Sequence, residues 1–396
     1  VLFIQSQQFF GADSQIHASL MRHLSRERYE VHCAIPDARH GQPSDAAIAV
    51  GRIPSVRLRP TDFGPSLESV SRLSAMGMLA RRGVPTIWSL LGLVRYVRRH
   101  DIRVLHCTEK PRDAVFGTIV AKLAGVRCVI HVHVKAESWI RSSVRRAMHH
   151  ADELIGVSRF VAQSIRDLGY DPSRVSAVLN GLEIEDWDEH GVDAAAIRSE
   201  FDIAADAPVI VSASRLFRFK GQHELLAALP EVVRRHPDVR TLIVGADDPR
   251  AYSGEERYSD VLRAICDEHD LWDHVIFTGW RSDVRSLMAT CDVYAMPSFE
   301  EPFGMVFTEA MYLRRPVVAL DNGGTPEVVE HGRSGLLSPP GDVGAIAANI
   351  VRLLDSRELR ERMGESGRQR VIDVLNAERM ARDVEFVYER LIGSAS

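Results

Sequence analysis

Cysteine is scarce in this chain, which excludes a disulfide-rich secreted domain. Its 396 residues contain five cysteines, scattered along the sequence, and no two have the spacing of a metal-binding pair. A reducing compartment follows most simply, so we expect a cytoplasmic protein. The five are Cys33, Cys107, Cys128, Cys266 and Cys291.

Long apolar runs and a strong charge of one sign are also missing. The longest apolar stretch, residues 87–94, is too short to span a bilayer. No secretory signal pattern is present. The net charge is −5 and the pI about 6.4, so bulk electrostatics gives no reason to expect nucleic-acid binding. Any membrane contact is expected to be peripheral and weak, at the inner face.

What the chain does have is an alternation of short Val- and Ile-rich runs with amphipathic stretches. This pattern predicts parallel sheets with crossover helices, and the length suits two domains. The expected strands lie near residues 1–5, 30–35, 102–106, 127–133, 153–157 and 174–179 in the first half. Those of the second half lie near 208–214, 239–245, 274–279, 292–296, 316–320 and 335–338.

Two doubly wound α/β domains are therefore expected, with ligands at the carboxyl ends of their strands. Residues 184–206 are acidic and interrupted by turn residues, with a short helix over 194–200. We interpret this segment as the interdomain linker.

Residues 298–327 form the most informative segment. They place Glu301 before a helix and Glu309 inside it. Eight helical steps span roughly 12 Å, which is too far for two carboxylates to share a proton but suits the two ends of an elongated ligand. The helix start would favour a diphosphate between them. The amides concerned are those of Phe303, Gly304, Met305 and Val306. The plain alternative is a capping acid and a solvated helix residue.

This segment resembles the signature of retaining glycosyltransferases of the GT-B fold, in the large family four (GT4), where seven residues separate two glutamates. Its flanks, 292–298 and 317–327, continue the match. The resemblance implies two Rossmann-like domains facing an interdomain cleft. It gives an acceptor-side domain over 1–190, a sugar-nucleotide domain over 191–375, and a C-terminal helix over 376–396 that crosses back to the first domain.

The loop of residues 214–221 follows an expected strand and precedes a helix, which puts Arg215 and Lys220 at the mouth of the sheet. Arginine can hold a phosphate with paired donors, and lysine supplies a mobile point charge. The loop resembles the family's element of Arg, four residues and Lys-Gly. The resemblance implies that both cations stabilise the departing diphosphate. Taken alone, the loop would equally suit a solvated basic surface.

No set of metal ligands is apparent. The formal match to an Asp-x-Asp motif, Asp186-Trp187-Asp188, lies in the expected linker and not at a strand end. Arg215 and Lys220 would do the work of a metal ion, so neither a metal nor another cofactor is expected.

Gly11, after the first strand, would let the backbone approach a ligand at a helix start. Family members commonly have two glycines there, whereas this chain has Gly11-Ala12. His131 and His133 alternate along one strand and point to the same face. The resemblance implies that His133 contacts the transferred sugar. His131 is expected to be a core residue, and metal chelation by the pair lacks an evident Asp or Cys partner.

The first half is locally basic, and two interpretations of residues 87–99 stay open. With Trp88, Leu90, Leu91, Leu93 and Val94, the arginines would form an interfacial helix touching anionic lipid. We favour the other interpretation, an amphipathic crossover helix packed on the sheet. The arginines are Arg52, Arg57, Arg59, Arg72, Arg81, Arg82, Arg95, Arg98, Arg99 and Arg103.

The sequence thus predicts a retaining, metal-independent glycosyltransferase that moves a hexose-type sugar from a nucleoside diphosphate to an unidentified acceptor. UDP is the default carrier, and GDP and ADP stay open. The resemblance implies that Glu301 contacts sugar hydroxyls and Glu309 the ribose. A sugar-nucleotide epimerase of the same fold and a noncatalytic nucleotide-binding protein are the alternatives. A dehydrogenase is disfavoured because the first loop lacks Gly-x-Gly-x-x-Gly.

Overall fold

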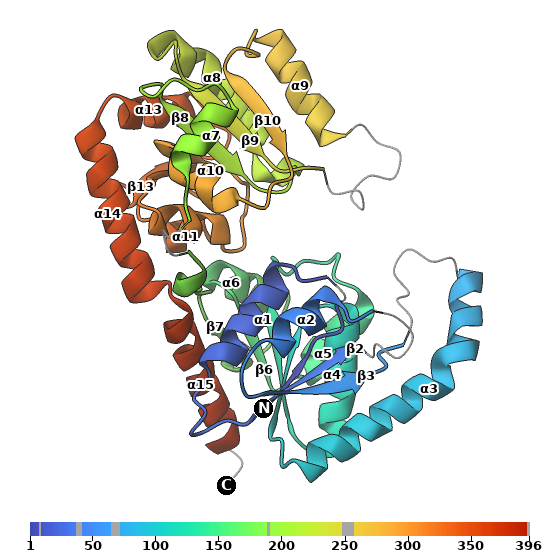
Figure 1. Ribbon diagram of the computed structural model, residues 1–396. Helices are drawn as coiled ribbons and strands as arrows, with labels where there is room; N and C mark the ends of the chain where they lie inside the picture. Colours follow the sequence, from blue (N-terminus) through green and yellow to red (C-terminus); the bar gives the residue numbers. More distant parts are fainter. Residues whose placement is uncertain (8, 37–41, 65–71, 188–190, 248–256, 394–396) are drawn as a thin grey trace. The chain divides into compact units, whose positions relative to one another are not determined.

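A computed structural model of the chain divides into two units, each built on one parallel sheet (Figure 1). The first unit comprises Val1–Leu179 and Ala377–Ser396, and the second comprises Asn180–Asn376. The structure describes all residues except 8, 37–41, 65–71, 188–190, 248–256 and 394–396, and the side chains of 72–82 are also left out. The expected boundary at residue 190 falls inside the second unit.

In the described residues, the first unit has a seven-stranded sheet in the order β3-β2-β1-β4-β5-β6-β7. Its strands are β1 (Leu2–Ile4), β2 (Val31–Pro36), β3 (Val56–Thr61), β4 (Val104–Thr108), β5 (Arg127–Val132), β6 (Glu153–Gly156) and β7 (Val175–Ala177). Its helices are α1 (Ala12–His23), α2 (Asp45–Gly51), α3 (Arg72–Arg99), α4 (Pro111–Ala124), α5 (Ser142–His150), α6 (Arg159–Asp167) and α15 (Ala377–Gly393), with a 3-10 turn at Pro172–Arg174.

Strand β3 is absent from the sequence prediction. It is an edge strand of half-exposed residues, and Arg57 and Arg59 interrupt its apolar pattern. The central strands β1 and β4 are buried throughout and read as apolar runs, which is why the sequence reveals them. An edge strand buries less of its surface, so its apolar signal is weaker.

The second unit has a six-stranded sheet in its described part, in the order β10-β9-β8-β11-β12-β13. The strands are β8 (Val209–Ala213), β9 (Arg240–Val244), β10 (Val275–Gly279), β11 (Val293–Ala295), β12 (Val317–Leu320) and β13 (Gly335–Ser338), all within the predicted ranges. The helices are α7 (Ala194–Glu200), α8 (Gln222–Arg235), α9 (Tyr258–Glu268), α10 (Val284–Thr290), α11 (Met305–Tyr312), α12 (Thr325–Val328), α13 (Val343–Leu354) and α14 (Arg357–Val374), with 3-10 turns at Ile184–Trp187 and Arg218–Lys220.

The segment expected to link the domains, residues 184–206, belongs instead to the second unit. Helix α7 packs against α10 through the buried side chain of Ile197, and Arg198 donates hydrogen bonds to the carbonyls of Ala204 and Ala207. The acidic surface of this segment suggested a solvated linker. The Asp193 amide also donates to the Ser286 hydroxyl at 3.2 Å, and Arg198 lies 3.9 Å from the Asp292 carboxylate, so the segment is fixed to the domain.

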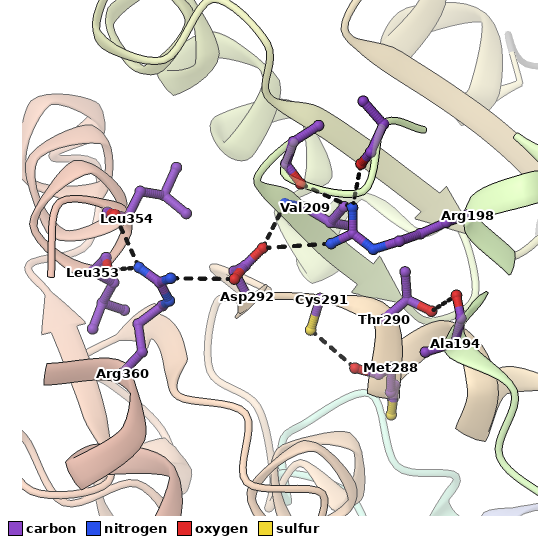
Figure 2. A network of polar contacts seen from close by, with 12 residues as sticks. Ala194, Arg198, Val209, Met288, Thr290, Cys291, Asp292, Leu353, Leu354 and Arg360 are labelled. Carbon is purple, nitrogen blue, oxygen red and sulfur yellow. Dashed lines mark hydrogen bonds and ion pairs between the residues drawn. The ribbon is translucent and has the colours of Figure 1, made fainter. Parts of the chain in front are cut away.

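At the amino ends of β8 and β11, a charged network joins four elements (Figure 2). Asp292 accepts a hydrogen bond from the Val209 amide at 2.9 Å. Its carboxylate lies 3.4 Å from the Arg360 guanidinium and 3.9 Å from that of Arg198. The network therefore braces the sheet at the edge opposite the loops that carry the predicted site.

Both sheets reverse their strand order next to the first strand of the unit, between β1 and β4 and between β8 and β11. In open parallel sheets, the crevice for ligands lies at the carboxyl ends of the strands at this switch point. The loops after β1, β5, β8 and β11 are therefore the places to look for a site.

Candidate functional site

The acidic segment follows β11 at the switch point of the second sheet. The chain turns at Pro297 and Ser298, and Glu301 lies in the loop before α11, whereas Glu309 lies within that helix. Because β8 and β11 are parallel neighbours, the basic loop after β8 reaches the same edge. The tertiary structure thus brings the two predicted motifs together.

Lys220 and Glu301 form an ion pair between these loops. The Lys220 Nζ lies 2.7 Å from the Glu301 Oε2, and the two side chains are only 13% and 8% exposed. Lys220 also lies over the ring of Phe219, 4.8 Å from its centroid. A buried pair of this kind fixes both groups in position. Lys220 retains N–H donors, and Glu301 retains its second oxygen, for a ligand.

Gly221 makes the contact between the loops possible. Its φ is 75°, and a β-carbon there would lie 1.9 Å from the carbonyl oxygen of Pro297. In addition, the Phe299 amide donates to the carbonyl of Phe219 at 2.7 Å. A glycine at this position therefore sets the distance between the basic loop and the acidic segment.

Glu309 is half-buried and, among the described residues, its carboxylate has no hydrogen-bond or ion-pair partner. Burial raises its pKa to about 7. Burial raises the pKa of Tyr294, and the charges of Glu309 and Glu301 raise it further; its hydroxyl donates to the carbonyl of Ala213. Both acids therefore lie near Tyr294. The Glu309 carboxylate is a hydrogen-bond acceptor to which no described residue donates.

The start of α11 provides amide donors. Gly304 is its N-cap residue, with φ of 90°, and no side chain caps this helix start in the described part of the chain. A β-carbon at Gly304 would meet the ring of Phe307 at 2.4 Å and the Glu301 Cγ at 3.2 Å. Phe303 is buried, whereas Met305 and Val306 are half-buried. An anion is favoured at such a helix start.

Arg215 lies just beyond the carboxyl end of β8 and is exposed. The backbone of its loop is held by Gln222, which is fully buried and donates to the Ser214 hydroxyl at 2.7 Å and to the Arg215 carbonyl at 3.4 Å. The guanidinium therefore stands on a fixed backbone at the mouth of the sheet.

In the first unit, Gly11 is the N-cap residue of α1. A β-carbon there would lie 2.9 Å from a ring atom of Phe9. His133 follows the end of β5 and is half-buried, and its amide donates to the Glu109 carboxylate at 3.2 Å. His131 is fully buried, and its Nδ1 lies 3.3 Å from the Nε2 of His106.

Sequence reasoning missed two histidines that surround this pair. His17 on α1 has its ring centroid 5.4 Å from that of His133, and His106 on β4 lies 4.8 Å from His17. No local signal reveals this arrangement, because it depends on α1 lying over β4 and β5. The third histidine beside His131 and His133, His17, is thus far away from them in the sequence.

Other residues singled out in the sequence are exposed or lie outside the described residues. Asp186 is exposed, whereas Asp188, the other acid of the Asp-x-Asp match, lies outside the described residues. So do the side chains of Arg72, Arg81 and Arg82.

Two family models match this chain. The one described as "Glycosyltransferase Family 4" matches residues 17–186, and the one described as "Glycosyl transferases group 1" matches residues 193–370. Together they span most of both units. The fold and the two matches define a GT-B glycosyltransferase, and the chain belongs to the GT4 family.

Similar proteins agree with this assignment. N-acetyl-alpha-D-glucosaminyl L-malate synthase of Bacillus anthracis is 23% identical over 304 residues, 75% of this chain and 77% of that protein. The GDP-mannose-dependent alpha-(1-6)-phosphatidylinositol monomannoside mannosyltransferase of Mycolicibacterium smegmatis is 28% identical over 303 residues, 73% and 76% of the two chains. Anabaena Alr3699/HepE in complex with UDP has a TM-score of 0.78 at 21% identity, over 98% of this chain and 99% of that chain, which shows the fold.

Proposed function

We propose that this glycosyltransferase transfers a hexose-type sugar from a nucleoside diphosphate with retention of configuration and without a metal or other cofactor. The observation that carries this proposal is the ion pair of Lys220 and Glu301, buried beside the uncapped start of α11. At this edge of the sheet, the cation and the amide donors suit a diphosphate. The carboxylate, which accepts hydrogen bonds, suits the hydroxyls of a sugar.

The diphosphate is assigned to Lys220, Arg215 and the amides of Met305 and Val306. Negative charge accumulates on the leaving phosphate oxygen as the bond to the sugar breaks, and preorganised cations and amides stabilise it. Lys220 keeps N–H groups that it does not donate to Glu301, and these can donate to the phosphate. Two protein cations at this place take over the charge neutralisation that a divalent ion supplies elsewhere.

Glu301 is assigned to the sugar hydroxyls and Glu309 to the ribose. Glu301 keeps one carboxylate oxygen outside its pair with Lys220, and a hydroxyl can donate to it. Glu309 lacks a protein partner in the described part of the chain and has a pKa of about 7. Hydroxyl donors would satisfy this half-buried carboxylate, which is why a ribose suits it.

The reaction proposed is a front-face substitution. The bond between C1 of the sugar and the diphosphate oxygen breaks, the acceptor oxygen bonds to C1 on the same face, and the acceptor proton passes to the leaving phosphate oxygen. His133 contacts the sugar, Gly11 lets the first loop approach the donor, and the first unit binds the acceptor. Positioning and electrostatics supply the rate enhancement, so no enzyme nucleophile is needed.

A UDP-sugar is the first donor to test. Alr3699/HepE was solved with UDP, whereas the mycobacterial relative is named for GDP-mannose, so a GDP-sugar is the second. Thermal-shift screening of UDP, GDP and ADP with their sugars identifies the carrier, because a ligand that binds only the native state raises its melting temperature. No shift with any of them would contradict the proposal.

Product analysis then tests the chemistry. Release of free nucleoside diphosphate together with an α-linked product from an α-linked donor supports retaining transfer. Isomerised donor without an acceptor would indicate an epimerase instead. Nucleotide binding without turnover, across a broad acceptor panel, would indicate a noncatalytic protein.

We also propose that the protein is cytoplasmic and makes peripheral contact with the inner face of an anionic membrane. Helix α3 exposes an apolar stripe at helical spacing, with Val84, Ile87, Trp88 and Leu91 each 46–68% exposed. Arg95, Arg98 and Arg99 follow it. None of the helices in the described ranges has the length and apolar character needed to cross a bilayer. An apolar stripe beside arginines is the pattern of an interfacial helix.

Co-sedimentation with vesicles tests this contact. Binding should require anionic lipid and fall in Trp88→Ala, whereas Trp272→Ala, which removes an exposed tryptophan of the second unit, should leave it unchanged. Equal sedimentation with neutral and anionic vesicles would contradict the proposal.

A further inference from the structure

Three histidines from two elements of the first unit converge. His17 comes from α1, His131 from β5, and His133 from the residue after β5. Among the described residues, they form a group in which one nitrogen of each ring lies within 4.8 Å of the other two. Their ring centroids are 4.5 to 5.7 Å apart.

Four nitrogens of these rings are buried and have no hydrogen-bond partner in the described part of the chain. They are both nitrogens of His17 and the Nε2 atoms of His131 and His133. Buried polar atoms nearly always have a partner, so such a concentration of unsatisfied atoms points to a missing ligand. His17 and His131 are 0% exposed, which means that bulk solvent does not supply it.

The protonation state of the rings suits a metal. Burial lowers the pKa of His17 to about 4 and holds the pKa values of His131 and His133 well below their ordinary value. Burial therefore favours the neutral form of each ring, which is the form that binds a metal. Neutral imidazole nitrogens are preferred ligands of zinc and similar transition metals, whereas calcium and magnesium prefer oxygen.

A second layer of residues orients His131. Its Nδ1 lies 3.3 Å from the His106 Nε2, and the His106 Nδ1 lies 2.7 Å from the Tyr388 hydroxyl on α15. With His131 Nδ1–H donating to His106 and His106 Nδ1–H donating to Tyr388, the Nε2 of His131 keeps its lone pair toward the cluster. Metal-bound histidines are typically held in this way by an outer partner.

Charges of both signs lie near the cluster. Asp13 acts on His17, and Lys110 acts on His133. Lys110 lies 3.6 Å from the carboxylate of Asp13 and 3.7 Å from that of Glu109. Two acids therefore surround the one lysine, and this lysine is already paired.

We propose that His17, His131 and His133 bind a divalent transition-metal ion, with zinc as the best match, through one nitrogen each. A fourth position stays open for water, as in three-ligand zinc sites. Zinc–nitrogen bonds of about 2.0–2.1 Å require ligand atoms roughly 3.3 Å apart, so small side-chain rotations close the site. The ion ties α1 to β5. The site shares His133 with the proposed transfer reaction, whose diphosphate is assigned to the second unit.

Titration of the metal-stripped, tag-free chain with cobalt(II) tests the site. One equivalent should give the intense visible absorption of tetrahedral cobalt, and zinc should displace it. His17→Gln should lose this spectrum or bind at least tenfold more weakly. His150→Gln, which removes an exposed histidine of the same unit, should match the unsubstituted protein.

Two further measurements complete the test. Tyr388→Phe keeps all three ligands but removes the outer hydroxyl, so zinc affinity should fall roughly 10- to 100-fold. X-ray absorption on zinc-loaded unsubstituted protein should count three imidazole ligands, and it needs no variant that has to fold. Absence of a tetrahedral cobalt spectrum, unchanged binding by a folded His17→Gln, or fewer than three imidazoles would each overturn the proposal.

Discussion

The two units have their switch points at equivalent places but fill them with different chemistry. In the first unit, this region holds His17, His106, His131 and the half-buried His133, and burial lowers the pKa of all four. In the second unit it holds the ion pair of Lys220 and Glu301, and the exposed Arg215 follows the end of β8. The same parallel architecture thus presents charge in one unit and uncharged donors and lone pairs in the other. The strand order fixes the place of the site, and the side chains on the elements that meet there determine its chemistry.

Removal of the second unit's central cation should have the largest effect. Lys220→Ala loses a partner of the leaving phosphate, and turnover should fall by about 10²- to 10³-fold, as when a preorganised transition-state donor is removed. Arg218→Ala, an exposed cation of the same loop, should retain near-normal kcat. Steady-state kinetics with a thermal melt of each variant separates lost chemistry from lost folding. Near-normal turnover of Lys220→Ala would sink the phosphate assignment.

The spacing of the two charged loops can be disturbed without touching a charge. Gly221→Ala places a β-carbon where 1.9 Å separates it from the Pro297 carbonyl, so the loops must part and turnover should fall at least about tenfold. Gly341→Ala is the matched control, because its φ of 78° is nearly the same but no atom lies within 4 Å. Both should lose about 1 kcal/mol or more of stability from backbone strain. Equal kinetics in the two variants would contradict a role for the spacing.

Substitution of a histidine in the first unit should change the salt dependence of the reaction less than substitution of a charged residue in the second unit. His133→Asn, assayed with a chelator present, should lower kcat about tenfold, because it removes a neutral contact to the sugar. Its donor KM should keep the salt dependence of the unsubstituted enzyme, whereas Lys220→Ala should lose much of it. Measurement of KM over a range of ionic strength decides this. An identical salt response in all three proteins would break the comparison between the units.

Glu309 should make nucleotide binding depend on pH. Its carboxylate must be ionised to accept ribose hydroxyls, and its pKa is about 7. Affinity should therefore rise about tenfold between about pH 6 and pH 8. Calorimetry of Glu309→Gln should show weaker binding without this component, whereas exposed Glu268→Gln should match the unsubstituted protein. Unchanged affinity in Glu309→Gln would remove the ribose role.

The same residue affects stability with the opposite sign. Because its pKa in the folded chain lies above the ordinary value of 4.5, the native state holds a proton that the unfolded state has released. Its contribution to stability is therefore lost as the pH rises from about 4.5 to about 7. Glu309→Gln should remove this loss, which chemical denaturation at several pH values measures.

Much of the fold follows from local sequence. The predicted strands are found because buried parallel strands are continuous apolar runs between turn residues. The sequence does not reveal β3, because an edge strand can carry arginines. Residues 184–206 resemble a linker, because their few buried residues lie among polar ones. The order of Arg215, Lys220, Glu301 and Glu309 along the chain was sufficient to suggest the family.

By itself, the sequence determined the class of fold, the family and the residue types at the charged switch point, because these depend on periodicity and short motifs. Only the tertiary structure decided that Lys220 pairs with Glu301, that Glu309 is left without a partner among the described residues, and that His17 completes a group with His131 and His133. The physical reason is that such contacts join segments far apart in the chain. Strand order and helix packing create them, and no local pattern of residues encodes them.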